Sequence, residues 1–377
     1  MPEARGTVIH SARLVDGGAV HADAWVRFER EHVAAVGTGD SWRSAGHQHS
    51  DDTIVDASGH WLTPGFVDIH GHGGGGVSYD DGAEQILTAR ALHRAHGTTR
   101  AVISLVTAPL DALATRVALI AELCAAHPDI LGSHLEGPFL DPGHKGAHDA
   151  SQLREPDEAA VALLIEAASG TLRQVTIAPE LPGGMAAVAQ LRAAGVVPAI
   201  GHTDADFGGA QAAINAGAGL LTHAFNAMRG LHHRDPGPVA AATHDPRLVL
   251  EIIADGVHVH PEVVRMVFAA APARVALVTD AMAAAGASDG HYDLGSLGVD
   301  VVDGVARLSD GGAIAGSTLT QDAALRWCVE TVGIDVASAV TALTETPARA
   351  VGRGDDLGRL VPGFAADAVL LDDALRV

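Results

Sequence analysis

The sequence predicts an α/β fold, namely a (β/α)8 TIM-like barrel with a small β-sandwich domain formed by both chain termini. The 377-residue chain alternates strand-like and helix-like segments through its middle. Strands that alternate with helices run parallel, and eight of them in one domain suggest a closed barrel. Short strand-like runs between turn residues occupy both ends of the chain, and these predict the small β domain.

Both ends of the chain have the character of short strands. Residues 1–60 contain "GTVIHSARLVDG", "DAWVRFEREHVAAVG" and "TIVDASG", and the C-terminal part contains "LGRLVPGFAADAVLLDD". Neither end is large enough to bury a core alone, so we expect them to join. The predicted boundaries are a small β domain from residues 1–60 and 350–377, and a barrel domain from residues 61–349.

The middle of the chain supplies the predicted barrel strands. They are, in order, "WLTPGFVDIH", "TTRAVISLV", "ILGSHLE", "QVTIAPE", "VVPAIGHT", "GLLTHAF", "LVLEIIADGVH" and "RVALVTD". Alanine-rich stretches such as residues 82–96, 156–168 and 184–194 predict helices between them. A doubly wound open sheet could arise from the same alternation and is the alternative fold.

Composition excludes several classes of function. A net charge of −22 leaves no basic surface to offset the phosphates of a nucleic acid. No apolar run is long enough to span a membrane, and no secretory signal follows the N-terminal "MPEARG". Cys124 and Cys328 are the only cysteines. We therefore predict a reduced, cytoplasmic protein that binds neither nucleic acid nor membranes.

The stretch "PGFVDIHGH" ends a hydrophobic run in two histidines and continues into four glycines. Residues two apart on a strand point to the same side, so His70 and His72 would project together from the strand end. The glycines of residues 73–76 would let the backbone pass close to whatever the histidines hold. No lysine followed by serine or threonine accompanies them, so the glycine run is not a phosphate-binding P-loop.

Other candidate side chains also fall at predicted strand ends, which is where a barrel of this type carries its chemistry. Beyond His70 and His72 they are His134, Glu136, His202, His223, Asp255, His258 and Asp280. A single histidine of this kind could be a hydrogen-bonded residue of the barrel rim. Their repeated position at strand ends favours one shared site.

Histidines and carboxylates without a thiolate suit a divalent ion such as Zn²⁺ or Fe²⁺. Glu136, His202 and His223 could make a three-ligand site with an open position for water. His70 and His72 could hold a second ion, with Glu136 bridging the two. A bound ion lowers the pKa of a water molecule, and Asp280 is placed to take its proton and pass it to a leaving group.

Six motifs follow in the order typical of amidohydrolase-superfamily barrels: "PGFVDIHGH", "HLEGPF", "GHTDA", "THAFNAM", "DGVHV" and "VTDAMAAAG". More narrowly, the chain resembles the N-acetylglucosamine-6-phosphate deacetylases, and the likeness continues through "GGAIAGSTLTQ" and "PGFAADAVLLD". The resemblance implies a hydrolase of amino-sugar metabolism that converts N-acetylglucosamine 6-phosphate to glucosamine 6-phosphate and acetate. It also implies one or two divalent ions per subunit, Zn²⁺ first among them.

The resemblance assigns roles to particular residues. Glu136, His202 and His223 would bind the main metal, and Asp280 would be the catalytic acid and base. The implied substrate-binding residues are Ala147, His148, Asn226, Ala227, Arg234, His258, Ile314, Ala315, Gly316 and Ser317. Members of the family are often homodimers in which a residue like Arg234 approaches the neighbour's site. Some members lack a first-strand histidine and use one ion, whereas His70 and His72 are both present here.

Two other functions remain as alternatives. Cyclic amidases such as dihydroorotase commonly bridge two metals with a carboxylated lysine on the fourth strand, whereas this strand ends in "TIAPE" and the only lysine is Lys145. A catalytically silent sugar-phosphate-binding protein could share the barrel. It would usually lack a ligand or the acid/base, and every such position is filled here. Among cations, Arg234, Arg229 and Lys145 are candidates to meet a substrate phosphate.

Overall fold

The computed structural model of the protein describes residues 6–44 and 51–377 and confirms the predicted fold class. Eight parallel strands form one sheet in the order β15-β14-β13-β12-β11-β10-β9-β6. Their bounds are β6 Phe66–Asp68, β9 Thr98–Val106, β10 Ile130–Glu136, β11 Leu172–Ile177, β12 Val197–Ile200, β13 Leu220–Leu221, β14 Val249–Ile253 and β15 Val275–Val278. Each lies within one of the eight strand-like segments or overlaps it. The strands follow one another in chain order without the reversal of a doubly wound sheet, and the chain after the last strand bonds to the chain after the first, so the open-sheet alternative is wrong.

The first and last strands meet just beyond their C-terminal ends. The backbone N–H of Asp280 donates to the carbonyl of His70 at 2.8 Å. Below that contact the hydroxyl of Thr279 donates to the carboxylate of Asp68 at 2.6 Å. These bonds bring the last predicted strand end beside the first, which places Asp280 next to the two histidines of "HGH".

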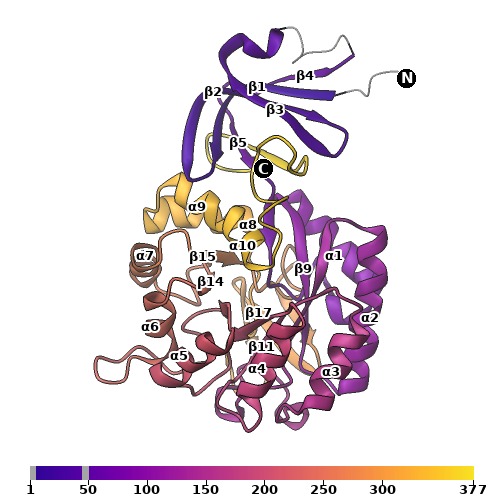
Figure 1. Cartoon of the computed structure of the whole chain (residues 1–377), viewed down its shortest axis with the longest axis vertical. Coiled ribbons are helices and arrows are strands. Elements are labelled where there is room, and N and C mark those ends of the chain that lie inside the picture. The colour runs from indigo at the N-terminus through magenta and orange to yellow at the C-terminus, as the bar shows by residue number, and fades with distance from the viewer. Residues whose placement is uncertain (1–5, 45–50) are drawn as a thin grey trace.

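Helices cover the outside of the barrel (Figure 1). They are α1 Ala83–Ala95, α2 Leu110–Ala126, α3 Glu158–Ala167, α4 Gly184–Ala193, α5 Phe207–Ala216, α6 Gly237–His244, α7 Pro261–Ala270, α8 Gln321–Trp327, α9 Val336–Leu343 and α10 Glu345–Ala350. Shorter helical segments are η1 Gly39–Arg43, η2 Tyr79–Asp81, η3 Pro142–His144, η4 Ala150–Gln152 and η5 Cys328–Val332. The three predicted helical stretches correspond to α1, α3 and α4. Apolar side chains of strands and helices form one continuous core between the two layers.

Both ends of the chain contribute to a separate six-stranded sheet, which stands at one end of the barrel in Figure 1. Its strands are β1 Gly6–Asp16, β2 Ala19–Glu29, β3 His32–Thr38, β4 Thr53–Asp56, β5 Trp61–Pro64 and β19 Ala368–Leu371. The segment "WLTPGFVDIH" is therefore divided, because β5 pairs with β1 and β19 whereas β6 pairs with β9. The exact domain boundaries stay a prediction.

Two small antiparallel units lie near the C-terminal ends of the barrel strands. The glycine run forms a hairpin from β7 Gly73–Gly74 and β8 Val77–Ser78. A Cβ atom on Gly73 would lie 2.3 Å from the carbonyl oxygen of Val77, so only glycine fits there. After Asp280 the chain forms a three-stranded sheet, β16 Gly290–Leu294, β17 Leu297–Val302 and β18 Val305–Leu308. We call this sheet the lid sheet.

No helix in residues 6–44 and 51–377 has the length and apolar content that a membrane span requires.

Candidate active site

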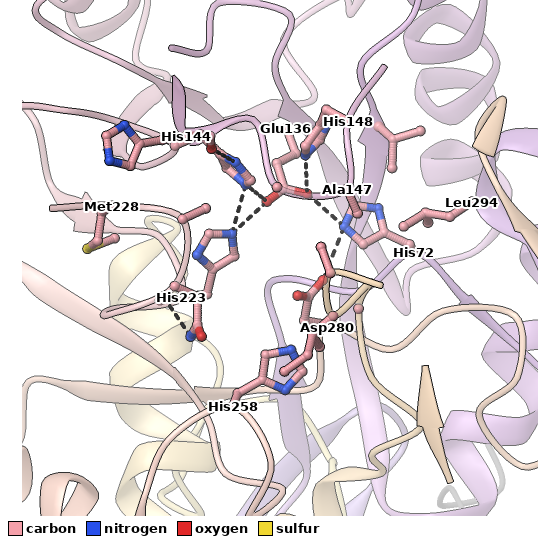
Figure 2. Close-up of a pocket in the computed structure, with 18 of the residues that line it drawn as sticks. His72, Glu136, His144, Ala147, His148, His223, Met228, His258, Asp280 and Leu294 are labelled. Carbon is pink, nitrogen blue, oxygen red and sulfur yellow. Dashed lines mark hydrogen bonds and ion pairs between the residues drawn. The ribbon is translucent and has the colours of Figure 1, made fainter. Parts of the chain in front are cut away.

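A cavity of about 380 Å³ opens at the C-terminal ends of the barrel strands. Figure 2 shows histidines and carboxylates from several strand ends pointing into it. The lining residues are His72, Val106, Glu136, Gly143, His144, Gly146, Ala147, His148, His202, His223, Asn226, Ala227, Met228, His258, Asp280, Leu294, Ala313, Ile314 and Gly316. Six of the nine predicted strand-end side chains therefore line one pocket, and His70, His134 and Asp255 do not line it.

Glu136 lies at the centre of this pocket, and its carboxylate faces two sets of side chains. Its Oε1 atom is 3.0 Å from Nε2 of His202 and 3.0 Å from Nε2 of His223. The two histidine nitrogens are themselves 3.0 Å apart. We call Glu136, His202 and His223 the His202 group.

The other oxygen of Glu136 faces the first and last strands. Glu136 Oε2 is 3.0 Å from Nε2 of His72 and 3.4 Å from Nε2 of His70. Asp280 Oδ1 is 3.3 Å from Nε2 of His72 and 3.5 Å from Nε2 of His70. We call His70, His72 and Asp280, with Glu136, the His70 group. Glu136 thus joins two neighbouring sets of donor atoms.

The protonation of His202 shows that these donors fit a cation. Its Nδ1 atom is 2.9 Å from the carbonyl of His144, which can only accept, so Nδ1 carries the proton. Burial lowers the pKa of His202 to about 4, so the ring is neutral and Nε2 holds a lone pair. A lone pair that faces a carboxylate oxygen at 3.0 Å is repulsive unless a positive ion lies between them. Histidine nitrogen and carboxylate oxygen are the donors that Zn²⁺ and Fe²⁺ accept.

The carboxylates of the cluster remain ionised. Burial raises the pKa of Asp280, but the charge of His70 and the hydrogen bond from His72 outweigh it and hold the pKa below its usual range. Burial likewise raises the pKa of Glu136, and the surrounding histidines, His70 first and then His148, His202 and His223, bring it well below its usual value. Both groups are therefore available as ligands or proton acceptors.

The backbone is bent sharply where His202, His223 and Asp280 leave the strands. His202, His223 and Asp280 all have positive φ angles, of 48°, 25° and 47°. Residues with a Cβ atom rarely adopt this conformation, and it costs free energy that the surrounding structure must supply. Immediate turns after β12, β13 and β15 direct these side chains across the mouth of the barrel instead of along its wall.

A second layer of polar groups lies under the cluster, and the sequence analysis did not identify it. His134 bonds to Ser104 through Nδ1 at 2.9 Å and to Thr176 through Nε2 at 2.8 Å. It therefore belongs to this layer, not to the pocket lining. Glu251 on β14 is fully buried and bonds to His70. A charged residue inside the apolar strand "LVLEIIADG" was the signal that could have revealed it.

The predicted substrate-binding residues fall into three sets. Ala147, His148, Asn226, Ala227, His258, Ile314 and Gly316 line the cavity. Ala315 and Ser317 are buried beside it, and the hydroxyl of Ser317 donates to the carbonyl of Thr279 at 2.6 Å. Arg234 is exposed on the segment before α6 and does not line the cavity of its own chain.

Seven lining residues escaped sequence reasoning: Val106, Gly143, His144, Gly146, Met228, Leu294 and Ala313. Val106, Ala147 and Leu294 belong to one apolar cluster beneath the lid sheet. In Figure 2, Ala147 and Leu294 lie on the same side of the pocket as His72, and Met228 lies on the opposite side. Apolar loop residues carry no sequence signal that separates them from ordinary core residues.

The cations proposed for a phosphate are engaged elsewhere. Among the described residues, no lysine or arginine lines the cavity. Arg229 forms ion pairs with Asp204 at 2.9 Å and Asp235 at 2.7 Å. Lys145 is half-buried, and its ammonium group donates to the carbonyls of Gly146 and His148. Positive charge in the pocket of one chain therefore comes from histidines alone.

Comparison with known proteins agrees with this geometry. The amidohydrolase family model matches residues 61–376. An N-acetylgalactosamine-6-phosphate deacetylase from Escherichia coli is 41% identical over 329 residues, covering 86% of this chain and 87% of that protein. An N-acetylglucosamine-6-phosphate deacetylase from Vibrio furnissii is 37% identical, covering 84% and 80%. A Mycobacterium smegmatis N-acetyl-D-glucosamine-6-phosphate deacetylase, solved in complex with N-acetyl-D-glucosamine-6-phosphate, has 41% identity and a TM-score of 0.92, covering 99% and 97%. The chain belongs to the amidohydrolase family.

Proposed function

We propose that the protein removes acetate from N-acetylglucosamine 6-phosphate and releases glucosamine 6-phosphate. The observation that carries this proposal is the cluster in which Glu136 joins two histidine groups, with Asp280 at its edge facing the cavity. Relatives of 37–41% identity that cover at least four fifths of the chain are deacetylases of N-acetylated hexosamine 6-phosphates. A cyclic amidase is disfavoured because no lysine bridges the cluster.

The His202 group would hold the main ion, and His70 and His72 would hold a second ion, with Glu136 shared between them. Such an ion supplies Lewis acidity and lowers the pKa of a water molecule towards neutrality. We propose Zn²⁺ as the first candidate, with Fe²⁺ or another divalent ion as the alternative.

Asp280 would move the proton in this reaction. Its carboxylate is ionised and lies at the cavity wall, so it can accept a proton from the attacking water. Asp280 can then transfer that proton to the amide nitrogen, which makes the amine a good leaving group. His148 would orient the acetyl carbonyl, because its Nδ1 accepts from the N–H of Thr107 at 3.4 Å and its proton is therefore on Nε2, at the cavity wall and 3.5 Å from Oε2 of Glu136.

The sugar and its phosphate would lie between the loops that follow the sixth, seventh and eighth strands. Here Asn226, Ala227, His258 and the segment from Ile314 to Ser317 would contact them. His258 bonds through Nδ1 to Asp255 at 2.7 Å, and this contact fixes the orientation of the ring.

A phosphate dianion needs more positive charge than these histidines provide. Arg234 lies on the exposed segment before α6, which projects from the barrel in Figure 1. We propose a homodimer in which Arg234 of one copy approaches the pocket of the other. A cytoplasmic location remains the accompanying prediction, as the substrate is an intracellular type of metabolite.

A second candidate substrate is N-acetylgalactosamine 6-phosphate, which differs only in the configuration of the 4-hydroxyl group. The 41% identical relative from Escherichia coli that acts on this sugar favours it. Both sugars require the same metal centre and the same proton transfer.

The test is acetate release by the metal-replete protein from both sugar phosphates, with unphosphorylated N-acetylglucosamine alongside. Rapid release from N-acetylglucosamine 6-phosphate and little from the free sugar is the expected result. Preference for the galactose epimer would change the substrate but keep the reaction. Release from none of the three would overturn the proposed function.

A further inference from the structure

We infer that Glu251 is the positioning residue that allows the His70 group to hold its metal ion. This inference rests on the metal centre described under the proposed function and concerns a residue outside both ligand groups. Glu251 lies on β14 and its exposed fraction is 0%. A carboxylate so fully buried is costly unless it is paired, so its partners define its role.

Glu251 has three polar partners within the barrel. Its Oε2 atom is 2.9 Å from Nδ1 of His70 and accepts from the backbone N–H of His223 at 3.3 Å. Its Oε1 atom accepts from the side-chain amide of Gln174 at 3.2 Å. Gln174 is itself held, because the same amide nitrogen donates to the carbonyl of Ile69 at 3.1 Å. The carboxylate is thus fixed between the strand that carries His70 and the turn that carries His223.

The contact with His70 decides which ring nitrogen carries a proton. A carboxylate can only accept, so Nδ1 of His70 must be the donor. In the form of His70 that can bind an ion, Nε2 has no proton and its lone pair faces Glu136 and Asp280, which are 3.4 and 3.5 Å away. This is the state in which a histidine binds a metal, and a carboxylate behind a ligand histidine strengthens it as a donor.

Glutamine at position 251 would keep the shape but break this arrangement. Its amide group has one oxygen, so that oxygen can face His70 or Gln174 but not both. If the nitrogen faces His70, the ring must accept at Nδ1 and carry its proton on Nε2, where the ion should bind. If the nitrogen faces Gln174, two donors oppose each other inside the core.

The effect should be confined to one of the two groups. Glu251 touches His70 through the ring but touches His223 only through its backbone. The rings of His202 and His223 keep their own contacts with Glu136. We therefore expect Glu251→Gln to weaken one ion and leave the other in place.

The experiment is a stepwise Co²⁺ titration of the metal-free full-length protein, followed by visible absorption, with Zn²⁺ per chain measured after equilibrium dialysis. The wild type should bind two ions. Glu251→Gln should bind the first ion as the wild type does and the second about 10–100-fold more weakly. Glu262→Gln is the matched control, because Glu262 lies on the surface of α7 and pairs only with Arg265 among the described residues.

Several outcomes would overturn the inference. If the wild type binds one ion, or if Glu251→Gln binds both ions normally, Glu251 does not have this role. In either case, acetate release by the wild type would still support the proposed function. If circular dichroism shows that Glu251→Gln does not fold, Gln174→Met provides the test. That variant keeps the carboxylate of Glu251 but removes the hydrogen bond from Gln174 to its Oε1 atom. It should weaken the binding of the second ion by a smaller factor than Glu251→Gln does. Unchanged binding of both ions would exclude the role.

Discussion

The floor and the rim of the pocket are built differently. The floor consists of side chains at strand ends, among them Glu136, His202 and Asp280, and all three are at most 7% exposed. The rim consists of residues outside the barrel strands, such as Ala147 in a loop and Leu294 at the end of β16, and both line the cavity with apolar side chains. Rigid strands fix the atoms that the reaction needs, whereas loops determine which molecule fits above them. Substitutions should therefore have large effects on the floor and small, selective effects on the rim.

The largest effect should come from Glu136→Gln on the floor. Within residues 6–44 and 51–377, Glu136 alone contacts members of both histidine groups through separate oxygens. Loss of its charge should release both ions and remove the activated water, which lowers kcat/KM about 10⁴-fold or more. Metal content and acetate release are measured together. Normal metal content in this variant would show that the two groups do not share a bridging carboxylate.

Asp280→Asn should have the next largest effect. The amide keeps the size of the side chain and leaves one oxygen beside His72, but it cannot accept the proton of the attacking water. We expect kcat to fall about 10³-fold while the His202 group keeps its ion. Full turnover with full metal content would refute the assignment of Asp280 as the proton shuttle.

The same contrast explains what the sequence could predict. His70, Glu136, His202 and Asp280 were predicted because the barrel topology assigns them to strand ends, and strand ends of a barrel meet. Glu251 was missed because it lies inside a strand, where hydrophobic periodicity indicates only burial. Its role depends on the neighbour that faces it across the barrel, and that neighbour is 181 positions away.

The rim was predicted only where the family resemblance supplied it. His148 and Asn226 line the cavity as expected, but Arg234 lies outside the cavity of its own chain. The position of Leu294 depends on how the lid sheet folds back over the pocket, and a leucine at the end of a short strand carries no mark of that. The division of the chain at residue 60 and near residue 350 remains a prediction, and β5 shows how closely the two parts interlock.

Leu294→Ala should sharpen the comparison by changing selectivity more than rate. Leu294 and Val106 form an apolar wall beside His72, and the methyl group of a bound acetyl group must lie close to the cluster. Removing this side chain should raise kcat/KM for an N-butyryl analogue about tenfold relative to the N-acetyl substrate. Leu297→Ala is the control, because Leu297 packs in the same cluster but does not line the cavity. An unchanged ratio would place the acyl group elsewhere.

The smallest effect should come from the contact that joins the lid sheet to the loop before α3. The hydroxyl of Ser296 donates to Asp149 at 3.0 Å, and next to it the backbone of Gly295 packs against Val106. One exposed hydrogen bond contributes little, so Ser296→Ala should raise KM about twofold and leave kcat unchanged. Thr318→Ala is the matched control, because its hydroxyl bonds to the carbonyl of Gly304 away from the pocket. A fall in kcat of the size expected for Asp280→Asn would mean that the rim helps to set the geometry of the floor, and the division between the two would not hold.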